Sequence, residues 1–358
     1  MRIVRARIDA VGAPYPRPLF YRDPPATTNT AVVVTLEEAG GALGFGYAPT
    51  FGFGTAALRT LIDEDLAPLL AGIDLVAVDD GVRLMADAAG IAGRPAGMAR
   101  QGIAILEMAL WDLAGHLAGM ALHALWGQPT GAVRAYASGG WRYLPVEDLA
   151  QRARSWARDG FKGVKLQVGL SPAEDLARLR SVRDAVGPEV QIMLDANQRI
   201  PADLVLEWGR ALAPHHPAWL EEPIPADDHR RMALLRAASA IPIAGGESES
   251  EPSGLEDLLE RDAVDVIQPD IHRAGLGAAR AVRTRASQTS TSVSPHMAHE
   301  VSVHVLSGVA GDGWLEYFDW FEDWWESPVL PTAGHVTPAT GTGHGLRLRP
   351  GWLEAHRI

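Results

Sequence analysis

Three carboxylates occupy positions from which they could hold a divalent metal ion together. Asp195, Glu221 and Glu247 come late in the apolar segments IMLDAN, WLEEPI and IPIAGGES, and neighbouring members are 26 residues apart (195 to 221, 221 to 247). A strand and the helix after it have about this length, so we expect the three acids side by side at the ends of successive parallel strands. Grouped carboxylates repel one another unless a cation lies between them, and Mg²⁺ prefers oxygen ligands. The spacing therefore predicts a Mg²⁺ site on these residues.

The next strand ends carry an acid and a histidine that could accept a proton. Asp270 lies in VDVIQPDI and His296 in TSVSPH, again 26 residues apart (270 to 296). A carboxylate beside an imidazole holds one tautomer and makes the ring more basic, so we interpret His296 as a general base and Asp270 as its partner. Glu316, in WLEYF, could donate a hydrogen bond to a substrate if it is protonated, or simply close the ring of strand ends.

Three further polar residues are expected near the same rim. Lys165 and Gln167 in GVKLQVG are two residues apart and so share one side of a strand. A lysine at this place needs a carboxylate or an anionic substrate beside it, and the two interpretations are compatible. Asn197 follows Asp195 by two residues, and we interpret it as a candidate for binding substrate hydroxyl groups.

A repeated unit of short strand, polar tip and amphipathic helix runs through residues 131–325. The helical stretch PAEDLARLRSVRDAVG, for example, begins with Ser171 as N-cap and Pro172 at the first helical position. Eight such units predict a parallel α/β barrel that carries the catalytic site. The predicted strand segments are 135–138, 163–169, 192–197, 219–224, 241–248, 264–271, 291–296 and 314–318.

The two ends of the chain lack this repeat. Residues 1–130 combine strand-like stretches (2–10 and 31–36) with helical ones (56–70 and 98–118), which predicts an α+β capping domain. Residues 326–358 are rich in Gly, Pro and Thr, and we expect this segment to return to the cap.

Two loops of the cap are expected to close over the site. They contain FYRDPP (20–25) and GYAPTFGFG (46–54). Tyr21 and Arg22 in the first loop, and Tyr47 and Phe51 in the second, are candidates for contacting the substrate.

The composition limits the classes of protein to consider. The chain has 358 residues, no cysteine and a net charge of −12. The absence of cysteine excludes disulfides and thiolate ligands, and the acidic balance argues against nucleic acid as a partner. No apolar segment approaches the length of a membrane helix, so we expect a cytoplasmic protein that binds a small-molecule carboxylate and no membrane.

Together these residues resemble the mandelate racemase subgroup of the enolase superfamily. The matching motifs are K-x-Q at Lys165, D-A-N at Asp195, W-L-E-E-P at Glu221, G-G-E-S at Glu247, and the pair of Asp270 and His296, with L-E-Y at Glu316. The resemblance implies a modified (β/α)7β TIM-type barrel with an N-terminal α+β capping domain that the C-terminal tail completes. It also implies Mg²⁺ on the three acids, His296 as base oriented by Asp270, Glu316 hydrogen-bonded to the substrate carboxylate, and a homo-oligomer, often an octamer.

One position departs from the pattern of subgroup members that racemise their substrates. These usually carry K-x-K, with the second lysine as the base on the face opposite the histidine, whereas this chain has Gln167. An amide cannot exchange protons as an acid or base, so a single base remains. We therefore expect dehydration of an acid sugar, an aldonate or aldarate, to a 2-keto-3-deoxy acid.

Other functions stay open at this point. A sugar-lactone cycloisomerase would use the same enolate, and a racemase or epimerase would need Lys165 to replace the missing base. The non-enzymatic alternative is an inactive barrel that serves in binding or assembly. We interpret Trp141, Trp320, Trp324 and Trp325 as packing or subunit contacts, and we expect the tryptophan-rich C-terminal region to suit a subunit interface.

Overall fold

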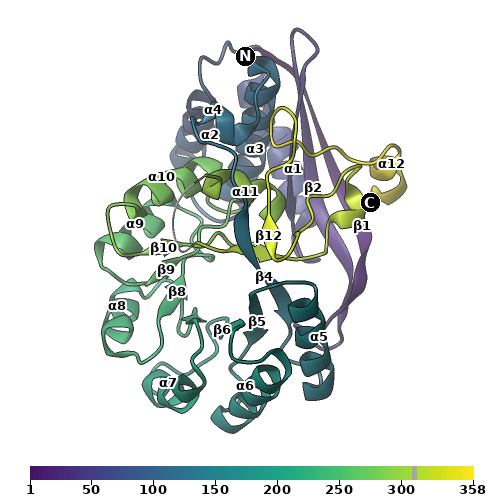
Figure 1. Cartoon of the computed structure of the whole chain (residues 1–358). Helices are drawn as coiled ribbons and strands as arrows, with labels where there is room; N and C mark the ends of the chain where they lie inside the picture. Colours follow the sequence, from purple (N-terminus) through teal and green to yellow (C-terminus); the bar gives the residue numbers. More distant parts are fainter. Residues whose placement is uncertain (309–312) are drawn as a thin grey trace.

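The computed structural model describes residues 1–308 and 313–358. Its larger part is a curved sheet of eight parallel strands in the order β10-β9-β8-β7-β6-β5-β4-β11 (Figure 1). Each strand falls within or overlaps one of the predicted segments, so the eight predicted strands are confirmed. Their bounds are β4 (Val133–Gly140), β5 (Gly163–Gln167), β6 (Gln191–Asp195), β7 (Trp219–Glu221), β8 (Ile243–Gly245), β9 (Val266–Ile267), β10 (Ser292–Val293) and β11 (Leu315–Tyr317).

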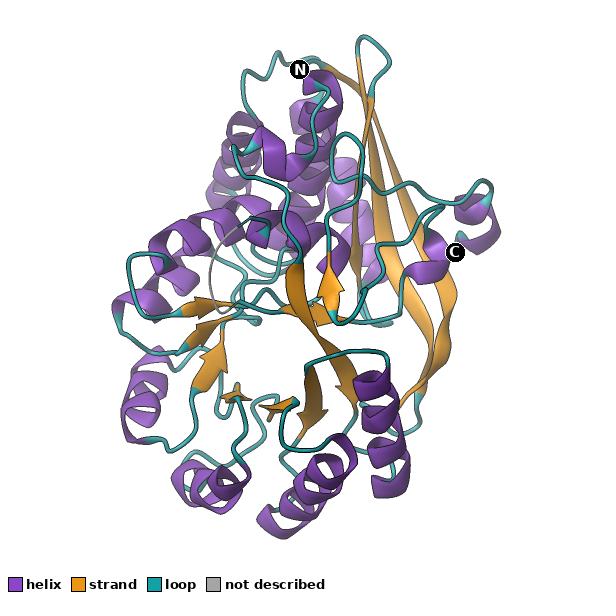
Figure 2. Ribbon diagram, viewed as in Figure 1, coloured by secondary structure: helices purple, strands orange, loops and turns teal. Residues whose placement is uncertain are grey.

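Helices follow these strands and surround the outside of the curved sheet (Figure 2). The predicted N-terminus of α6 is confirmed: Glu174 N donates to Ser171 Oγ at 3.2 Å, and Pro172 is the first helical residue. Ser294 Oγ donates to Trp314 O (2.8 Å) and so connects the two edges of the sheet beside β10 and β11. The helices are α5 (Val146–Arg158), α6 (Pro172–Val186), α7 (Val205–Leu212), α8 (His229–Ala238), α9 (Pro252–Glu260), α10 (Leu276–Ala286) and α11 (His299–Leu306).

The N-terminal cap is an antiparallel sheet of β1 (Ile3–Leu19), β2 (Ala26–Glu38) and β3 (Leu43–Pro49), covered by helices. The third strand was not predicted, because GYAPTFGFG was interpreted as a loop; its first four residues belong to β3. Gly44 and Gly46 let β3 lie directly on α3, since a Cβ at either glycine would come within 2.2 Å of a carbonyl oxygen of α3. The cap helices are α1 (Thr55–Thr60), α2 (Val78–Ile91), α3 (Met98–Ala118) and α4 (Leu122–Leu125), with the π-helix η1 (Leu61–Leu66) and the 3-10 helix η2 (Ala67–Leu70) between α1 and α2.

The C-terminal segment crosses from the barrel to the cap sheet (Figure 1). β12 (His335–Val336) pairs antiparallel with β4, and α12 (Trp352–His356) lies against β1. Ile358 N donates to Ala10 O at 3.0 Å. None of the helices in the described part of the chain is long and apolar enough to cross a membrane.

The tryptophans near residue 324 are buried inside one chain. Trp324 and Trp325 are each 1% exposed, and the Trp325 ring lies 5.3 Å from that of Tyr47 in the cap. Trp324 packs on Trp352 of α12 at 4.4 Å. Of the two roles predicted for these rings, packing is confirmed for Trp324 and Trp325: they join barrel, cap and tail, because a large aromatic surface is most stable away from water. A subunit contact in this region stays a prediction.

A pair of buried histidines connects α4 to α11 and to the tail. His304 Nε2 must donate to the carbonyl of His344 (3.2 Å), so in the neutral ring its Nδ1 accepts from His123 Nδ1 at 3.1 Å. Burial lowers the pKa of His304 to about 3, and it also lowers the pKa of His123 below its ordinary value. Both rings are neutral in the folded protein.

This pair predicts a component of acid sensitivity in the fold. His304 stays neutral when folded but takes up a proton below about pH 6.5 when unfolded, so its stabilising contribution is present above pH 6.5 and is lost as the pH falls toward 3. The loss is on the order of 4 kcal/mol. Denaturant unfolding at a series of pH values should show a flatter dependence for His304→Gln than for wild type. The exposed His335→Gln is the control, and equal slopes in wild type and His304→Gln would contradict the assignment.

Candidate active site

A cavity of about 350 Å³ lies where the C-terminal ends of the barrel strands meet the cap. It brings together residues from seven of the eight barrel strands or the loops after them, and it also receives Tyr21 and Phe51 from the cap. Its charged and amide-bearing lining residues are Arg142, Lys165, Gln167, Asp195, Asn197, Arg199, Glu247, Arg273, His296 and Glu316.

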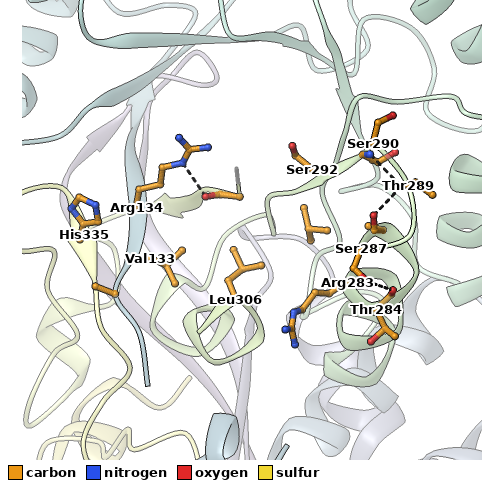
Figure 3. A pocket seen from close by; sticks show the side chains of 15 residues that line it. Val133, Arg134, Arg283, Thr284, Ser287, Thr289, Ser290, Ser292, Leu306 and His335 are labelled. Carbon is orange, nitrogen blue, oxygen red and sulfur yellow. Dashed lines mark hydrogen bonds between the residues drawn. The ribbon is translucent and has the colours of Figure 1, made fainter. Parts of the chain in front are cut away.

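A larger cavity of about 610 Å³ opens at the opposite end of the barrel (Figure 3). Arg134, from the start of β4, and His335 lie on one side, and the hydroxyl groups of Ser287, Thr289 and Ser290 lie on the other (Figure 3). Its described lining residues include no carboxylate. We therefore place the candidate active site in the smaller cavity, where acids, a histidine and a lysine converge.

The three predicted metal ligands lie on adjacent strand ends. Asp195 ends β6 and is paired with Glu221, which ends β7, while Glu247 follows β8 by two residues. All three are buried, with 3%, 0% and 8% of their surface exposed. Glu221 Oε2 accepts from Trp219 Nε1 (3.1 Å) and Gln268 Nε2 (2.8 Å), which fixes its orientation. Parallel strands in register thus produce the side-by-side arrangement that the spacing predicts.

Burial disfavours the ionised form of the proposed metal ligands, and the positive charge near them does not fully offset this effect. Burial raises the pKa of Glu221 to about 8, against the lowering effect of Lys165, and burial also raises the pKa of Glu247. Among residues 1–308 and 313–358, no three acidic or histidine side chains lie close enough together to coordinate one ion. Glu247 Oε2 instead faces His296 Nε2 at 3.2 Å. The donor set nevertheless fits a divalent cation chemically, because such an ion would stabilise ionised carboxylates that burial disfavours.

Lys165 is the cation at the centre of the site. Its Nζ lies 2.6 Å from Glu221 Oε1, 2.9 Å from Glu316 Oε1 and 3.4 Å from Asp195 Oδ2. Burial lowers the pKa of Lys165, but these carboxylates outweigh burial and raise the pKa well above its ordinary value. Lys165 is therefore a permanent ammonium group in this arrangement and has no free pair of electrons to accept a proton.

Glu316 is ionised as well. Burial raises its pKa, but the charges of Lys165 and His296 lower the pKa below its ordinary value. Its Oε2 accepts a hydrogen bond from Met297 N at 3.2 Å. This arrangement disfavours a protonated Glu316, because Lys165 Nζ lies 2.9 Å from Oε1 and His296 Nε2 lies 3.7 Å from Oε2. A hydrogen bond from Glu316 to a substrate stays a prediction.

His296 and Asp270 form the expected pair. His296 Nδ1 is 2.8 Å from Asp270 Oδ2, and Asp270 Oδ1 accepts from His272 N at 2.6 Å. Burial raises the pKa of Asp270, but His296 and Arg273 outweigh it and lower the pKa well below the ordinary range. Burial lowers the pKa of His296, whereas Glu247, Glu316 and Asp270 raise it to about 9. An ionised Asp270 thus holds the proton on Nδ1 and leaves Nε2 facing the cavity.

Gln167 and Asn197 support the site through one network. Gln167 Nε2 donates to Asn197 Oδ1 (2.7 Å), and Gln167 Oε1 accepts from Arg142 N (3.1 Å). Asn197 in turn donates to Asp195 from its backbone N (2.8 Å) and its Nδ2 (2.9 Å). In this structure both predicted substrate-binding amides are engaged with protein groups and position Asp195.

The cap candidates divide into two kinds. Tyr21 and Phe51 line the cavity, whereas Arg22 and Tyr47 do not. Arg22 is exposed, with its guanidinium over the Tyr21 ring at 5.8 Å. Tyr47 is fully buried in β3 and donates to Glu300 Oε1 at 2.5 Å. Tyr47 belongs to β3, which was not predicted, and the strand directs its side chain into the core.

Several lining residues were not predicted to face the site. Trp141, Phe318 and Trp320 form a stack of nearly parallel rings along the cavity, with Phe318 and Trp320 3.9 Å apart. The interpretation of Trp141 and Trp320 as packing residues was therefore incomplete. The arginines Arg142, Arg199 and Arg273 were also missed; each comes shortly after a barrel strand, which is the one signal in the sequence that could have indicated them.

Comparisons with known proteins agree with this geometry. Residues 11–127 match the mandelate racemase/muconate lactonizing enzyme N-terminal domain, and residues 148–352 match the enolase C-terminal domain-like family. The chain is 31% identical to a 3,6-anhydro-α-L-galactonate cycloisomerase of Streptomyces coelicolor, over 97% of each protein. It is 32% identical to an L-talarate/galactarate dehydratase of Salmonella typhimurium, over 91% of this chain and 82% of the relative. The crystal structure of a racemase from Streptomyces coelicolor with bound magnesium superposes with a TM-score of 0.94 at 30% identity and covers 99% of this chain and 100% of that one.

The amide network gives a prediction about stability. Gln167→Met keeps the length of the side chain but removes the hydrogen bonds to Arg142 N and Asn197 Oδ1, so we expect the free energy of unfolding to fall by about 1–3 kcal/mol. Denaturant unfolding without metal measures this difference. Gln191→Met, at the exposed start of β6, is the matched control. A loss no greater than that of the control would show that the network contributes nothing.

Proposed function

The chain belongs to the mandelate racemase and muconate lactonizing enzyme family, and we propose that it is a Mg²⁺-dependent acid-sugar dehydratase. The proposed reaction removes the proton alpha to a carboxylate and eliminates the β-hydroxyl group as water. The observation that carries the proposal is the pairing of His296 with Asp270 beside three buried carboxylates on successive strand ends.

Asp195, Glu221 and Glu247 would hold the Mg²⁺ ion. When bound, the ion supplies positive charge that stabilises the enolate formed when the alpha proton leaves. The surplus of buried negative charge at these residues supports the assignment, as does the magnesium bound in the similar racemase structure. Glu247 has to turn away from His296 to join the other two acids.

His296 would act as the base through Nε2. Asp270 keeps the other ring proton on Nδ1, which orients the ring and leaves Nε2 to accept the alpha proton. Glu247 is the first of the groups that raise the pKa of His296 to about 9. A cation on Glu247 weakens that effect, so it favours the neutral ring that the reaction requires.

Neither Gln167 nor Lys165, the two residues considered as a second base, is suited to return a proton from the opposite face. Gln167 is an amide, and Lys165 is an ammonium ion in contact with Glu316, which is not among the proposed metal ligands. The proton that His296 has taken is therefore best used on the same face: the imidazolium gives it to the departing β-hydroxyl while the C–O bond breaks. The substrate loses one water molecule, and the enol that remains becomes a 2-keto-3-deoxy acid. A single base disfavours racemisation and epimerisation.

The aromatic stack favours one alternative. Trp141, Phe318 and Trp320 present apolar ring surface to the cavity, and such surface packs well against the C–H face of a sugar ring. A sugar-lactone cycloisomerase is therefore the second candidate, because it would form the same enolate from a cyclic substrate. An inactive binding protein is disfavoured, since the acids, the base and its partner are all in place.

Metal binding should stabilise the fold. At a free Mg²⁺ concentration of 100 times Kd, the free energy of unfolding of the wild type should rise by about 2.7 kcal/mol. Glu247→Gln removes one proposed ligand and should abolish most of this gain in thermal unfolding measured with and without MgCl₂. Glu249→Gln, two residues away and paired with His229, is the matched control. Equal stabilisation of both variants by Mg²⁺ would place the ion elsewhere.

The reaction itself can be followed by NMR in D₂O with Mg²⁺ and a panel of aldonates, aldarates and sugar lactones. We expect exchange of the alpha proton and a 2-keto-3-deoxy product, with kcat/KM falling by roughly 10²- to 10⁴-fold in His296→Asn. The exposed His335→Asn serves as control. Consumption of lactones alone would support the cycloisomerase, and undiminished exchange in His296→Asn would refute its role as base.

A further inference from the structure

Besides His296, one lysine and three arginines line the active-site cavity, and these four fall into two pairs. Lys165 contacts three carboxylates, and Arg273 lies 3.5 Å from Asp270 Oδ2 and 3.9 Å from Glu247 Oε1. Arg142 and Arg199 form no ion pair with any residue in the described part of the chain. The acids are thus collected at one end of the cavity, and two arginines without a counter-ion remain.

Arg142 is a buried positive charge held by neutral groups. It is 3% exposed, its Nε donates to Val168 O (2.8 Å), and its Nη2 donates to Ala196 O and Asn197 Oδ1 (both 3.2 Å). Burial, and next the charge of Arg199, lower the pKa of Arg142 below its ordinary value. Arginine stays protonated in spite of such shifts, so a positive charge that is hydrogen-bonded only to neutral oxygens is fixed at this wall.

Arg199 is held beside it by a strained turn after β6. Asn197 and Gln198 both have positive φ, 43° and 60°, which is unfavourable for a residue such as glutamine. Four hydrogen bonds of Gln198 hold the turn: from its N to Glu222 O (2.7 Å), from its Nε2 to Glu222 Oε2 (2.9 Å) and Ser248 Oγ (3.0 Å), and from Ala226 N to its Oε1 (3.1 Å). Strain that the surroundings maintain is typical of functional sites. Here it fixes the backbone from which the exposed Arg199 reaches the cavity.

We propose that Arg199, supported by the charge of Arg142, binds a second carboxylate of the substrate, so that the enzyme prefers diacid sugars (aldarates) to monoacid sugars (aldonates). This inference rests on the proposed function, because it assumes that the reacting carboxylate occupies the end of the cavity near Lys165. The chain as a whole carries a net charge of −12, so attraction for an anionic substrate has to come from local groups of this kind.

The chemistry of a guanidinium group suits this role. Its planar fork matches the two oxygens of a carboxylate in a pair of parallel hydrogen bonds, whereas a terminal hydroxymethyl group is uncharged and offers only one oxygen. The terminal carbon is the one position at which an aldarate and its matched aldonate differ. Recognition of the terminal carboxylate by Arg199 therefore distinguishes aldarates from aldonates, and the end of the substrate that reacts is the same in both.

The test compares six-carbon aldarates with stereochemically matched aldonates, using alpha-proton exchange in D₂O with saturating Mg²⁺ as the readout. In Arg199→Gln, kcat/KM for exchange of the preferred aldarate should fall by about 10- to 100-fold, while the value for the matched aldonate should hardly change. Arg199→Lys keeps the charge but not the fork and should recover part of the loss. Arg230→Gln, at an exposed position of α8, is the control.

The outcomes separate this inference from the proposed function. Exchange of aldonates as fast as of aldarates, or an equal loss on both in Arg199→Gln, would overturn the diacid preference and leave the proposed function intact. A preference for an aldonate with a terminal phosphate over every aldarate would overturn the assignment to a carboxylate. No exchange of any acid by the wild type would overturn the proposed function and this inference together.

Discussion

Carboxylates can be buried together only where positive charge is supplied to them, and this constraint governs the active end of the barrel. Lys165 satisfies part of it, by contacting Asp195, Glu221 and Glu316 at once. His296 and Arg273 supply charge on the other side, next to Glu247 and Asp270. The raised pKa values of Glu221 and Glu247 show that the balance is still incomplete. A site built in this way is less stable than an apolar core of the same size, but it is ready for a cation and an anionic reactant.

The strand register positions these charged groups, whereas apolar burial elsewhere in the fold supplies the stability. The parallel register puts Asp195 opposite Glu221 at the strand ends, and the large apolar core lies below and around them. The smaller apolar cluster inside the barrel, which includes Tyr136, Met193 and Trp219, closes the space beneath the acids. Hydrophobic burial in the barrel and cap can thus offset the unfavourable free energy of burying charged groups at the rim.

The strand ends could be predicted from the sequence because their spacing repeats with the strand–helix unit. The proposed metal ligands and the pair of Asp270 with His296 follow from that one regularity and from the chemistry of the side chains, while Lys165 follows from its place within a strand segment. The unpaired Arg142 and Arg199 did not follow from it, because an arginine in a loop looks the same in sequence whether it faces solvent or a cavity. Tyr47 shows the opposite error: the segment 46–54 was interpreted as a loop, but its first residues form part of β3, where Gly44 and Gly46 allow a close contact with α3 that depends on tertiary packing.

The antiparallel contact between Val11 and Arg357 joins positions 346 residues apart (11 to 357). Arg357 Nε also lies 2.8 Å from Asp9 Oδ1 on the same strand. During synthesis on the ribosome, β1 emerges long before the C-terminal segment that covers its edge. The edge of the cap sheet therefore stays uncovered until the barrel residues have been synthesised. Contacts of such separation slow folding and expose strand edges to wrong pairing. The order in which this chain is made therefore favours a barrel that is largely formed before the cap acquires its final strand contact.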